Sequence, residues 1–314
     1  MVAPRHRVIA GSPGSPVILH VPHASTHIDG SVRARIRLTD TALAIELALL
    51  TDAHTDVIAE RAAGSARVEP CRFVNLQSRL VVDPERFPDE REELLARGMG
   101  AVYTRTAHGQ RLRDDDPSHI EALLATYYRP YAAAMTSTVD DRLAATGRAV
   151  VIDVHSYPSR ALPYELHADR PAGSASPGLM STGSAATGAG KEGDAAQAPR
   201  PARGERAQMA LLRPAVCLGT DPFHTPPGLL AAARDAFAAG GDPGAHGEIG
   251  EIGENAPFAG CYVPLKHYHR DPAVTAIMVE IRRDTYMAEP GGPPTAGLDA
   301  VAAALARLID AVTP

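Results

Sequence analysis

Short apolar runs alternate with longer segments of helical spacing along this 314-residue chain. The runs typical of buried strands cover residues 16–21, 148–156, 213–221 and 273–284, with shorter strand-like pieces at 66–71 and 72–83. Apolar residues at helical spacing predict helices over residues 39–63, 118–147, 226–239 and 295–314. Strands that are separated by helices need crossover connections. The pattern therefore predicts a single α/β domain over residues 1–314, with a mixed, mostly parallel sheet flanked by helices.

The segment 118–147 carries signals for both of its ends. Ser118 followed by Glu121 has the pattern of a capping box, so Ser118 is the expected N-cap. Pro130 lacks a backbone N–H, and we expect it to kink or split the helix. Gly147 is a typical residue for the end of a helix.

Residues 170–207 differ in composition from the rest of the chain. They are rich in Gly, Ala, Ser and Pro and hold almost no large apolar residue. Such a segment cannot bury enough apolar surface to offset the entropy that ordering would cost. Strand-like sequence resumes directly after it, so we expect a disordered insertion within the domain.

Charge and cysteine content exclude several classes of protein. The formal net charge is −6, so no basic surface favours nucleic acid or an anionic membrane as a partner. No run of about 18 apolar residues predicts a membrane span, and the N-terminus lacks the apolar core of a signal peptide. Cys71, Cys217 and Cys261 are far apart and form no C-x-x-C pair. This pattern argues against a disulfide framework and favours a reducing, cytoplasmic compartment.

Polar residues stand at the carboxyl ends of three predicted strands, where ligands bind in open α/β sheets. The three sets are His23, then Asp153, His155 and Ser156, and then Glu280, Arg282, Arg283 and Asp284. A buried Glu or His needs a partner. Two neutral imidazoles and a carboxylate around one divalent ion would satisfy this need, since catalytic zinc usually has three protein ligands and an open position. The alternative for a lone histidine is a structural role in the core, which we expect for His20.

The predicted helix 39–63 contains the candidates for a third metal ligand. Thr39 or Asp40 is the expected N-cap of this helix. Asp52 and Asp56 are four residues apart and would share one face of that helix. His54 would point elsewhere. The alternative interpretation is a solvated acidic face without a ligand.

Arginines near the apolar runs are candidates for binding a substrate carboxylate, which the planar guanidinium suits. They are Arg79, Arg282 and Arg283. The alternative is a structural salt bridge, for example between Arg79 and Asp83. Other histidines lie mostly in polar contexts and are expected at the surface: His108, His119, His224, His246, His267 and His269.

Six short motifs in the order "HVPHAS", "TDAHTD", "SRLVVDPER", "VIDVHS", "NAPFAGCYV" and "VEIRRDTYM" carry a family resemblance. The chain resembles the N-formylglutamate amidohydrolase family over roughly residues 15–310. That family is similar in fold to the zinc carboxypeptidases and aspartoacylase, a phosphorylase/hydrolase-like architecture. Each motif alone is short, and the specificity comes from all six in the right order.

The resemblance implies roles for particular residues. It implies His23, Asp52 and His155 as metal ligands, with Asp56 as the fallback for Asp52, and Glu280 as the catalytic glutamate. It also implies Arg79 as a catalytic arginine near the substrate, and it makes Arg86, Arg282 and Asn255 candidates for substrate binding. One departure is Glu85, which stands where the family has Asn. This change leaves the identity of the substrate open.

The expected function is zinc-dependent hydrolysis of N-formyl-L-glutamate or a similar small N-acyl amino acid, with a place in histidine degradation. One zinc ion is expected, although two histidines and an aspartate also suit manganese, iron or cobalt. The alternatives are a carboxypeptidase-like zinc peptidase or deacylase, and a non-catalytic scaffold that keeps the fold. A Ser-His-Asp hydrolase is disfavoured because no G-x-S-x-G elbow is present. The sequence does not indicate an oligomeric state.

Overall fold

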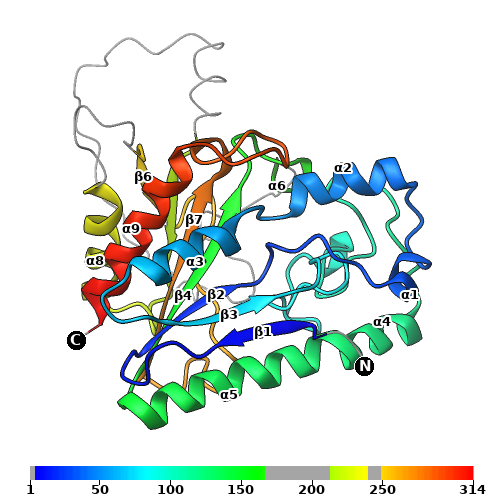
Figure 1. Ribbon diagram of the computed structural model, residues 1–314. Coiled ribbons are helices and arrows are strands. Elements are labelled where there is room, and N and C mark those ends of the chain that lie inside the picture. Colours follow the sequence, from blue (N-terminus) through cyan, green and yellow to red (C-terminus); the bar gives the residue numbers. More distant parts are fainter. Residues whose placement is uncertain (1–3, 167–212, 240–248, 314) are drawn as a thin grey trace, which may run out of the picture.

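The computed structural model describes residues 4–166, 213–239 and 249–313, and a seven-stranded sheet runs through them (Figure 1). The strand order is β1-β3-β2-β4-β7-β5-β6. The strands are β1 (His6–Ile9), β2 (Val17–Val21), β3 (Cys71–Asn75), β4 (Ala149–Tyr157), β5 (Val216–Gly219), β6 (Ile252–Glu254) and β7 (Val274–Arg282). The four strands β3, β2, β4 and β7 are parallel, whereas β1 and β5 are antiparallel to their neighbours β3 and β7. The predicted mixed, mostly parallel sheet is therefore confirmed.

Helices cover both faces of the sheet. On one face, α3 (Thr55–Ser65), α8 (Pro227–Ala238) and α9 (Gly297–Val312) contribute to the larger core cluster. On the other face lies α5 (Arg129–Thr146), which packs on the sheet through a second cluster (Figure 1). The α/β fold with a flanked sheet is thus the one that the alternating pattern predicts.

The period of two along each strand decides which residues meet the site. In β4, Val150, Ile152 and Val154 belong to the core under α3 and α9. Asp153 and His155 alternate with them, and so they lie on the face that α5 covers. Neighbouring strands follow the same alternation, since β2, β4 and β7 are paired in parallel. The polar residues therefore gather on one face near the carboxyl end of the sheet.

The predicted helix 39–63 is interrupted, which corrects its expected course. It forms α2 (Asp40–Leu50) and then α3. Thr39 is the N-cap of α2, and its side chain accepts a hydrogen bond from the backbone N–H of Ala42 at 3.2 Å. Between the helices the chain turns through His54, which has a left-handed φ of 67°. Asp52 therefore lies in a turn and does not share a helix face with Asp56.

The segment 118–147 is divided as Pro130 predicts, but its start is different from the expected one. It forms α4 (Pro117–Leu123), a π-helical turn η2 (Leu124–Tyr128) and α5. Asp116 is the N-cap, because its carboxylate accepts from the backbone N–H of Ser118 at 3.0 Å. Ser118 therefore lies two residues after the N-cap, inside the first turn of α4. Gly147 ends α5 with a φ of 77°, as expected.

Other differences concern short elements. Of the strand-like pieces at 66–71 and 72–83, only Cys71–Asn75 forms a strand, and the sequence pattern did not indicate β1 or β6. The remaining helical turns are α1 (Gly30–Arg33), η1 (Leu95–Arg97), α6 (Pro163–Leu166) and η3 (Arg283–Thr285). The predicted insertion at 170–207 lies outside the described residues. Among those residues, no helix is both long and apolar enough to cross a membrane.

Candidate active site

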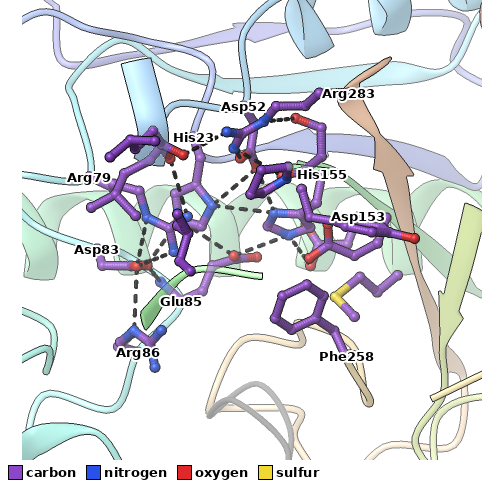
Figure 2. Close-up of a pocket in the computed structure, with 18 of the residues that line it drawn as sticks. His23, Asp52, Arg79, Asp83, Glu85, Arg86, Asp153, His155, Phe258 and Arg283 are labelled. Carbon is purple, nitrogen blue, oxygen red and sulfur yellow. Dashed lines mark hydrogen bonds and ion pairs between the residues drawn. The ribbon is translucent and has the colours of Figure 1, made fainter. Parts of the chain in front are cut away.

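A pocket lies at the carboxyl ends of β2, β4 and β7 (Figure 2). Its lining includes His23, Asp52, His155 and Glu280, which the sequence placed at a site. The pocket therefore lies where the strand-end rule for open α/β sheets places a ligand site.

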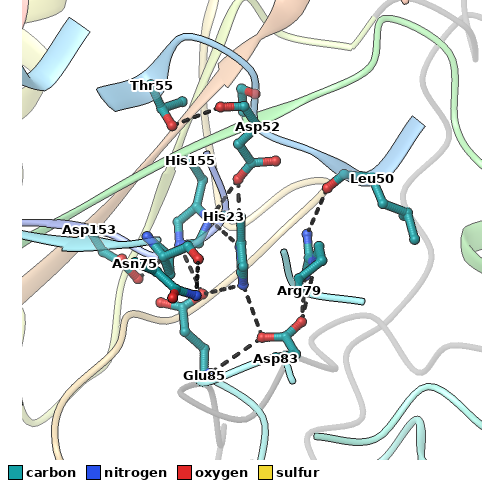
Figure 3. A network of polar contacts seen from close by, with 12 residues as sticks. His23, Leu50, Asp52, Thr55, Asn75, Arg79, Asp83, Glu85, Asp153 and His155 are labelled. Carbon is teal, nitrogen blue, oxygen red and sulfur yellow. Dashed lines mark hydrogen bonds and ion pairs between the residues drawn. The ribbon is translucent and has the colours of Figure 1, made fainter. Parts of the chain in front are cut away.

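Three side chains bring one donor atom each to a common point (Figure 3). His23 Nδ1 and His155 Nδ1 are 3.3 Å apart, and Asp52 Oδ2 lies 3.1 Å from the latter and 3.6 Å from the former. Tetrahedral zinc with bonds of about 2.0–2.1 Å would hold its ligands about 3.3 Å apart. The spacing and the two-nitrogen, one-oxygen donor set fit a divalent ion.

The turn between α2 and α3 positions Asp52. Its backbone N–H donates to the carbonyl of His23 at 3.0 Å, and the Thr55 hydroxyl donates to the carbonyl of Asp52 at 2.8 Å. Asp52 is 2% exposed. Asp56 is exposed on α3, and its carboxylate accepts from the backbone N–H of Val57. Asp52 is therefore the aspartate that the fold brings to the two histidines.

Carboxylates on the far side of each ring orient the two histidines. His23 Nε2 lies 2.9 Å from Asp83 Oδ1, and His155 Nε2 lies 3.0 Å from Asp153 Oδ2 and 3.1 Å from Glu85 Oε2. The hydrogen bond to Asp83 favours the His23 tautomer that carries hydrogen on Nε2, whereas His155 Nε2 makes no hydrogen bond to the described residues. Two ring nitrogens and a carboxylate oxygen that meet at such distances are suited to hold a cation between them.

The pKa shifts of His155 and Asp52 indicate the same need for positive charge between the three side chains. Burial by itself lowers the pKa of His155, but Asp153 and Glu85 outweigh it and raise that pKa well above its ordinary value. Burial likewise raises the pKa of Asp52, yet its contacts with His155 and His23 lower it below the usual range. Without a metal, protons on the histidines supply the charge that a divalent ion would supply.

Glu280 is a buried carboxylate next to the three donors. It lies on β7 in register with His155 on β4, and it is 8% exposed. Its Oε2 has no hydrogen-bond partner among the described residues. Burial, with a further contribution from Asp52, raises the pKa of Glu280 to about 7. A partnerless carboxylate in a pocket is suited to exchange a proton with a bound molecule.

The arginines of the pocket are engaged in pairs. Arg79 donates from Nη2 to Asp83 at 2.7 Å, so the salt bridge weighed from the sequence is present. Arg86 donates to Glu92 at 2.9 Å. Both arginines also line the pocket, and the Arg79 side chain is 17% exposed.

Two residues predicted for substrate binding lie outside the pocket lining. Arg282 pairs with Asp284 at 2.7 Å and also donates to the carbonyl of Arg213. Asn255 follows β6 with a φ of 52° and hydrogen-bonds to Thr220 through both side-chain polar atoms. Both side chains hold loops near the end of the sheet.

Sequence reasoning missed the parts played by three residues. Arg283 turns into the pocket at η3 and donates to Asp52 Oδ1 at 3.0 Å. Asp83 and Glu85 contact the outer sides of the two histidines, and their signal was the "DPER" departure. His20 hydrogen-bonds to Asp153 at 2.8 Å and to Tyr131 at 2.6 Å, in the structural role expected for it.

The histidines expected at the surface divide into groups. His224 is fully buried: its backbone N–H donates to Asp221, its Nδ1–H donates to the carbonyl of Val274, and its Nε2 accepts from the backbone N–H of His269. His267 is 5% exposed and lies between Asp140 and Asp271. The surface prediction was wrong for these two. His108 and His269 are exposed, His119 is half-buried, and His246 lies outside the described residues.

Comparison with known proteins identifies relatives of this architecture. A family model described as N-formylglutamate amidohydrolase matches residues 15–287. The crystal structure of N-formylglutamate amidohydrolase from Ralstonia eutropha has 17% identity and a TM-score of 0.68, over 98% of this chain and 96% of that one. A gene product from Agrobacterium tumefaciens also has 17% identity, with a TM-score of 0.59 over 98% and 94% of the two chains. At this identity the two structures establish the fold alone. No curated protein matches the chain.

Proposed function

The chain belongs to the N-formylglutamate amidohydrolase family, and from this we propose a metal-dependent hydrolase that cleaves the amide bond of an N-acyl amino acid. N-formyl-L-glutamate is the reference substrate, and formate and the free amino acid are the products. The observation that carries the proposal is the meeting of His23 Nδ1, His155 Nδ1 and Asp52 Oδ2 beside the partnerless carboxylate of Glu280.

His23, Asp52 and His155 would hold the metal ion, and we propose zinc. When bound, such an ion supplies Lewis acidity that polarises an amide carbonyl and lowers the pKa of water. The outer contacts of the histidines with Asp83, Asp153 and Glu85 keep both rings oriented for this ligand set. Arg283 fixes the remaining oxygen of Asp52.

Glu280 is the proposed general base. Its free Oε2 accepts a proton from the attacking water and delivers it to the leaving amine nitrogen. Arg79 is the positive charge that the substrate meets, because its side chain is more exposed than those of Arg86 and Arg283. Arg86 is held by its ion pair with Glu92 at the side of the pocket, and Arg283 holds the proposed ligand Asp52. Arg282 and Asn255 have no direct role in this proposal, since they lie outside the pocket lining.

The cellular setting is part of the proposal. All three cysteines are free and buried, which supports a reducing compartment such as the cytoplasm. A role in histidine degradation follows if N-formyl-L-glutamate is the physiological substrate.

The test is formate release from N-formyl-L-glutamate and from other N-formyl amino acids, with zinc-loaded protein and with a chelator-stripped control. We expect release that depends on the metal. Stoichiometric metal without hydrolysis of any N-acyl amino acid would overturn the proposed reaction. Absence of both metal binding and hydrolysis would favour a non-catalytic scaffold.

A further inference from the structure

Glu85 meets both histidine rings on the side opposite Asp52 (Figure 3). Asp52 Oδ2 lies 3.1 Å from His155 Nδ1 and 3.6 Å from His23 Nδ1. Glu85 Oε2 lies 3.1 Å from His155 Nε2 and 3.6 Å from His23 Nε2. The two rings therefore separate two carboxylates, each of which approaches a pair of ring nitrogens.

A second group of donor atoms lies on the Glu85 side of the rings. His20 Nδ1 is 2.8 Å from Asp153 Oδ1 and 3.5 Å from Glu85 Oε1. These three residues each offer one donor atom, and the three atoms all lie within 4.8 Å of one another. Ligands bonded to one ion at about 2.0–2.2 Å are about 2.8–3.6 Å apart at octahedral or tetrahedral angles. Both measured separations fall within the range expected for ligands of a single divalent ion.

Two buried polar atoms in this part of the pocket lack a hydrogen bond. Neither Glu85 Oε1 nor His155 Nε2 has a hydrogen-bond partner among the described residues. His155 is 5% exposed, and its Nε2 lies 3.0 Å from Asp153 Oδ2 and 3.1 Å from Glu85 Oε2 without bonding to either. Buried polar atoms of native proteins are nearly always satisfied, by the protein itself or by a bound water or ion. The two orphaned atoms therefore indicate that a further species binds here.

The charge of this group calls for a cation. Asp52 and Asp83 each pair with an arginine of the pocket. Within the described part of the chain, the side chains of Glu85 and Asp153 make their ionic contacts with histidines alone. Two carboxylates that share a buried site repel each other and are costly to keep ionised without a counter-charge. A divalent ion supplies two positive charges, which balance this pair.

We propose that His20, Glu85 and Asp153 bind a second divalent cation. It is distinct from the first ion, which was proposed above for the Nδ1 side of His23 and His155. Glu85 and Asp153 line the pocket, so the second ion reaches them through it. One imidazole and two carboxylates form a set that is richer in oxygen than the first one. Because carboxylate ligands suit manganese and imidazole suits zinc, the second site accepts Mn²⁺ while the first retains Zn²⁺.

Glu85 makes this site a feature of the present chain. It is the member of the group that departs from the family pattern, in which the position holds Asn. An amide carries no negative charge, so Asn at this position would leave a weaker cation site. The second ion also goes beyond the proposed hydrolysis, since a chain that hydrolyses no N-acyl amino acid can still bind it.

The first experiment titrates Mn²⁺ into protein that holds one Zn²⁺ per chain and follows the electron paramagnetic resonance signal of free Mn²⁺. We expect one Mn²⁺ to bind per chain while metal analysis still finds one Zn²⁺. Glu85→Gln should weaken Mn²⁺ binding by more than about 100-fold, because loss of an outer contact alone costs about 10- to 100-fold. Glu90→Gln is the matched control, since it makes the same change at an exposed glutamate nearby in the sequence.

The titration has clear contrary outcomes. Absence of Mn²⁺ uptake would overturn the second site. Uptake with release of an equal amount of Zn²⁺ would overturn it as well, because the two metals then compete for a single site. Equal Mn²⁺ affinity of Glu85→Gln and the wild type would exclude Glu85 as a ligand and thereby the site.

Asp52→Asn distinguishes failure of the second site from failure of the proposed function. In the variant whose folding circular dichroism confirms, we expect weaker Zn²⁺ binding and one Mn²⁺ still bound per chain, since Asp52 belongs to the first ligand set alone. Loss of both metals would overturn a separate second site. If the wild type retains no Zn²⁺ but binds one Mn²⁺ that Glu85→Gln loses and Asp52→Asn keeps, the second site stands and the zinc centre proposed for hydrolysis fails.

Discussion

Asp83 connects the proposed metal ligand His23 to the pocket arginines, and its replacement by Asn is the sharpest perturbation of the site. Oδ1 of Asp83 lies 2.9 Å from His23 Nε2, while Oδ2 accepts from Arg79 at 2.7 Å and from the Tyr103 hydroxyl at 2.7 Å. Burial alone would raise the pKa of Asp83, but Arg79 and His23 lower it well below the usual range. The native structure therefore holds this residue as a carboxylate.

Asp83→Asn keeps the size of the side chain and removes its charge. The Asn oxygen can still accept from His23, but it no longer makes the imidazole a stronger donor to a metal. Removing such an outer carboxylate typically weakens metal binding by about 10- to 100-fold, which corresponds to about 1.4–2.8 kcal/mol. The variant also leaves the buried Arg79 without its ion-pair partner, so the melting temperature should fall as well.

The assay is competition for zinc against a chromophoric chelator, with metal-free protein whose folding is checked by circular dichroism. Asp89→Asn is the matched control: Asp89 pairs with Arg91 at 2.7 Å on the surface, where such a pair contributes little. We expect weaker zinc binding in Asp83→Asn and unchanged binding in Asp89→Asn. Equal zinc affinity of the folded Asp83→Asn protein and the wild type would refute the orientation of His23 described above.

Three further predictions concern turnover, pH and the core. Glu280→Gln should keep stoichiometric zinc, measured by metal analysis, and lose about 10²- to 10⁴-fold in kcat; full turnover would exclude Glu280 as the base. Glu46 is buried and accepts from the N–H of Ala107 at 2.6 Å, and burial raises its pKa. Its folded state therefore binds the proton more tightly, so the unfolding free energy of the wild type relative to Glu46→Gln should fall as the pH rises above about 4.5. Urea unfolding at several pH values checks this, and a difference that grows with pH would contradict it. Ile152→Ala in the centre of β4 should cost about 2–5 kcal/mol, whereas the 57% exposed Ile45→Ala should cost little in the same assay.

The sheet and the meeting of polar residues at the ends of its central strands were predictable because both follow from strand periodicity. Apolar runs marked β2, β4 and β7, and parallel pairing brings their carboxyl ends to one edge. His23, His155 and Glu280 each stand at or just beyond such a run, so their meeting needs only the sheet. The short edge strands β1 and β6, of four and three residues, carry too few residues for a pattern to stand out.

The residues whose positions were predicted wrongly lie in turns, and the periodicity of apolar residues does not predict turns. Helical spacing continues across residues 51–54, but the left-handed His54 breaks the helix, and Asp52 reaches the site from the resulting turn. At the end of β7 the chain enters a 3-10 turn, which brings Arg283 rather than Arg282 toward Asp52. The contacts of Glu85 with both histidines join segments that only tertiary structure brings together.

The segment 79–86 has a consequence for how such an enzyme changes over generations. Within eight residues it supplies Arg79, Asp83, Glu85 and Arg86, and it forms neither a strand nor a helix. The three proposed metal ligands come from elsewhere, from the ends of β2 and β4 and the turn after α2. Substitution of the arginines in this segment can therefore alter which substrates are accepted, whereas substitution of Asp83 or Glu85 would also disturb the two proposed histidine ligands. Descendants of a common ancestor can acquire new substrates through substitutions in a single loop.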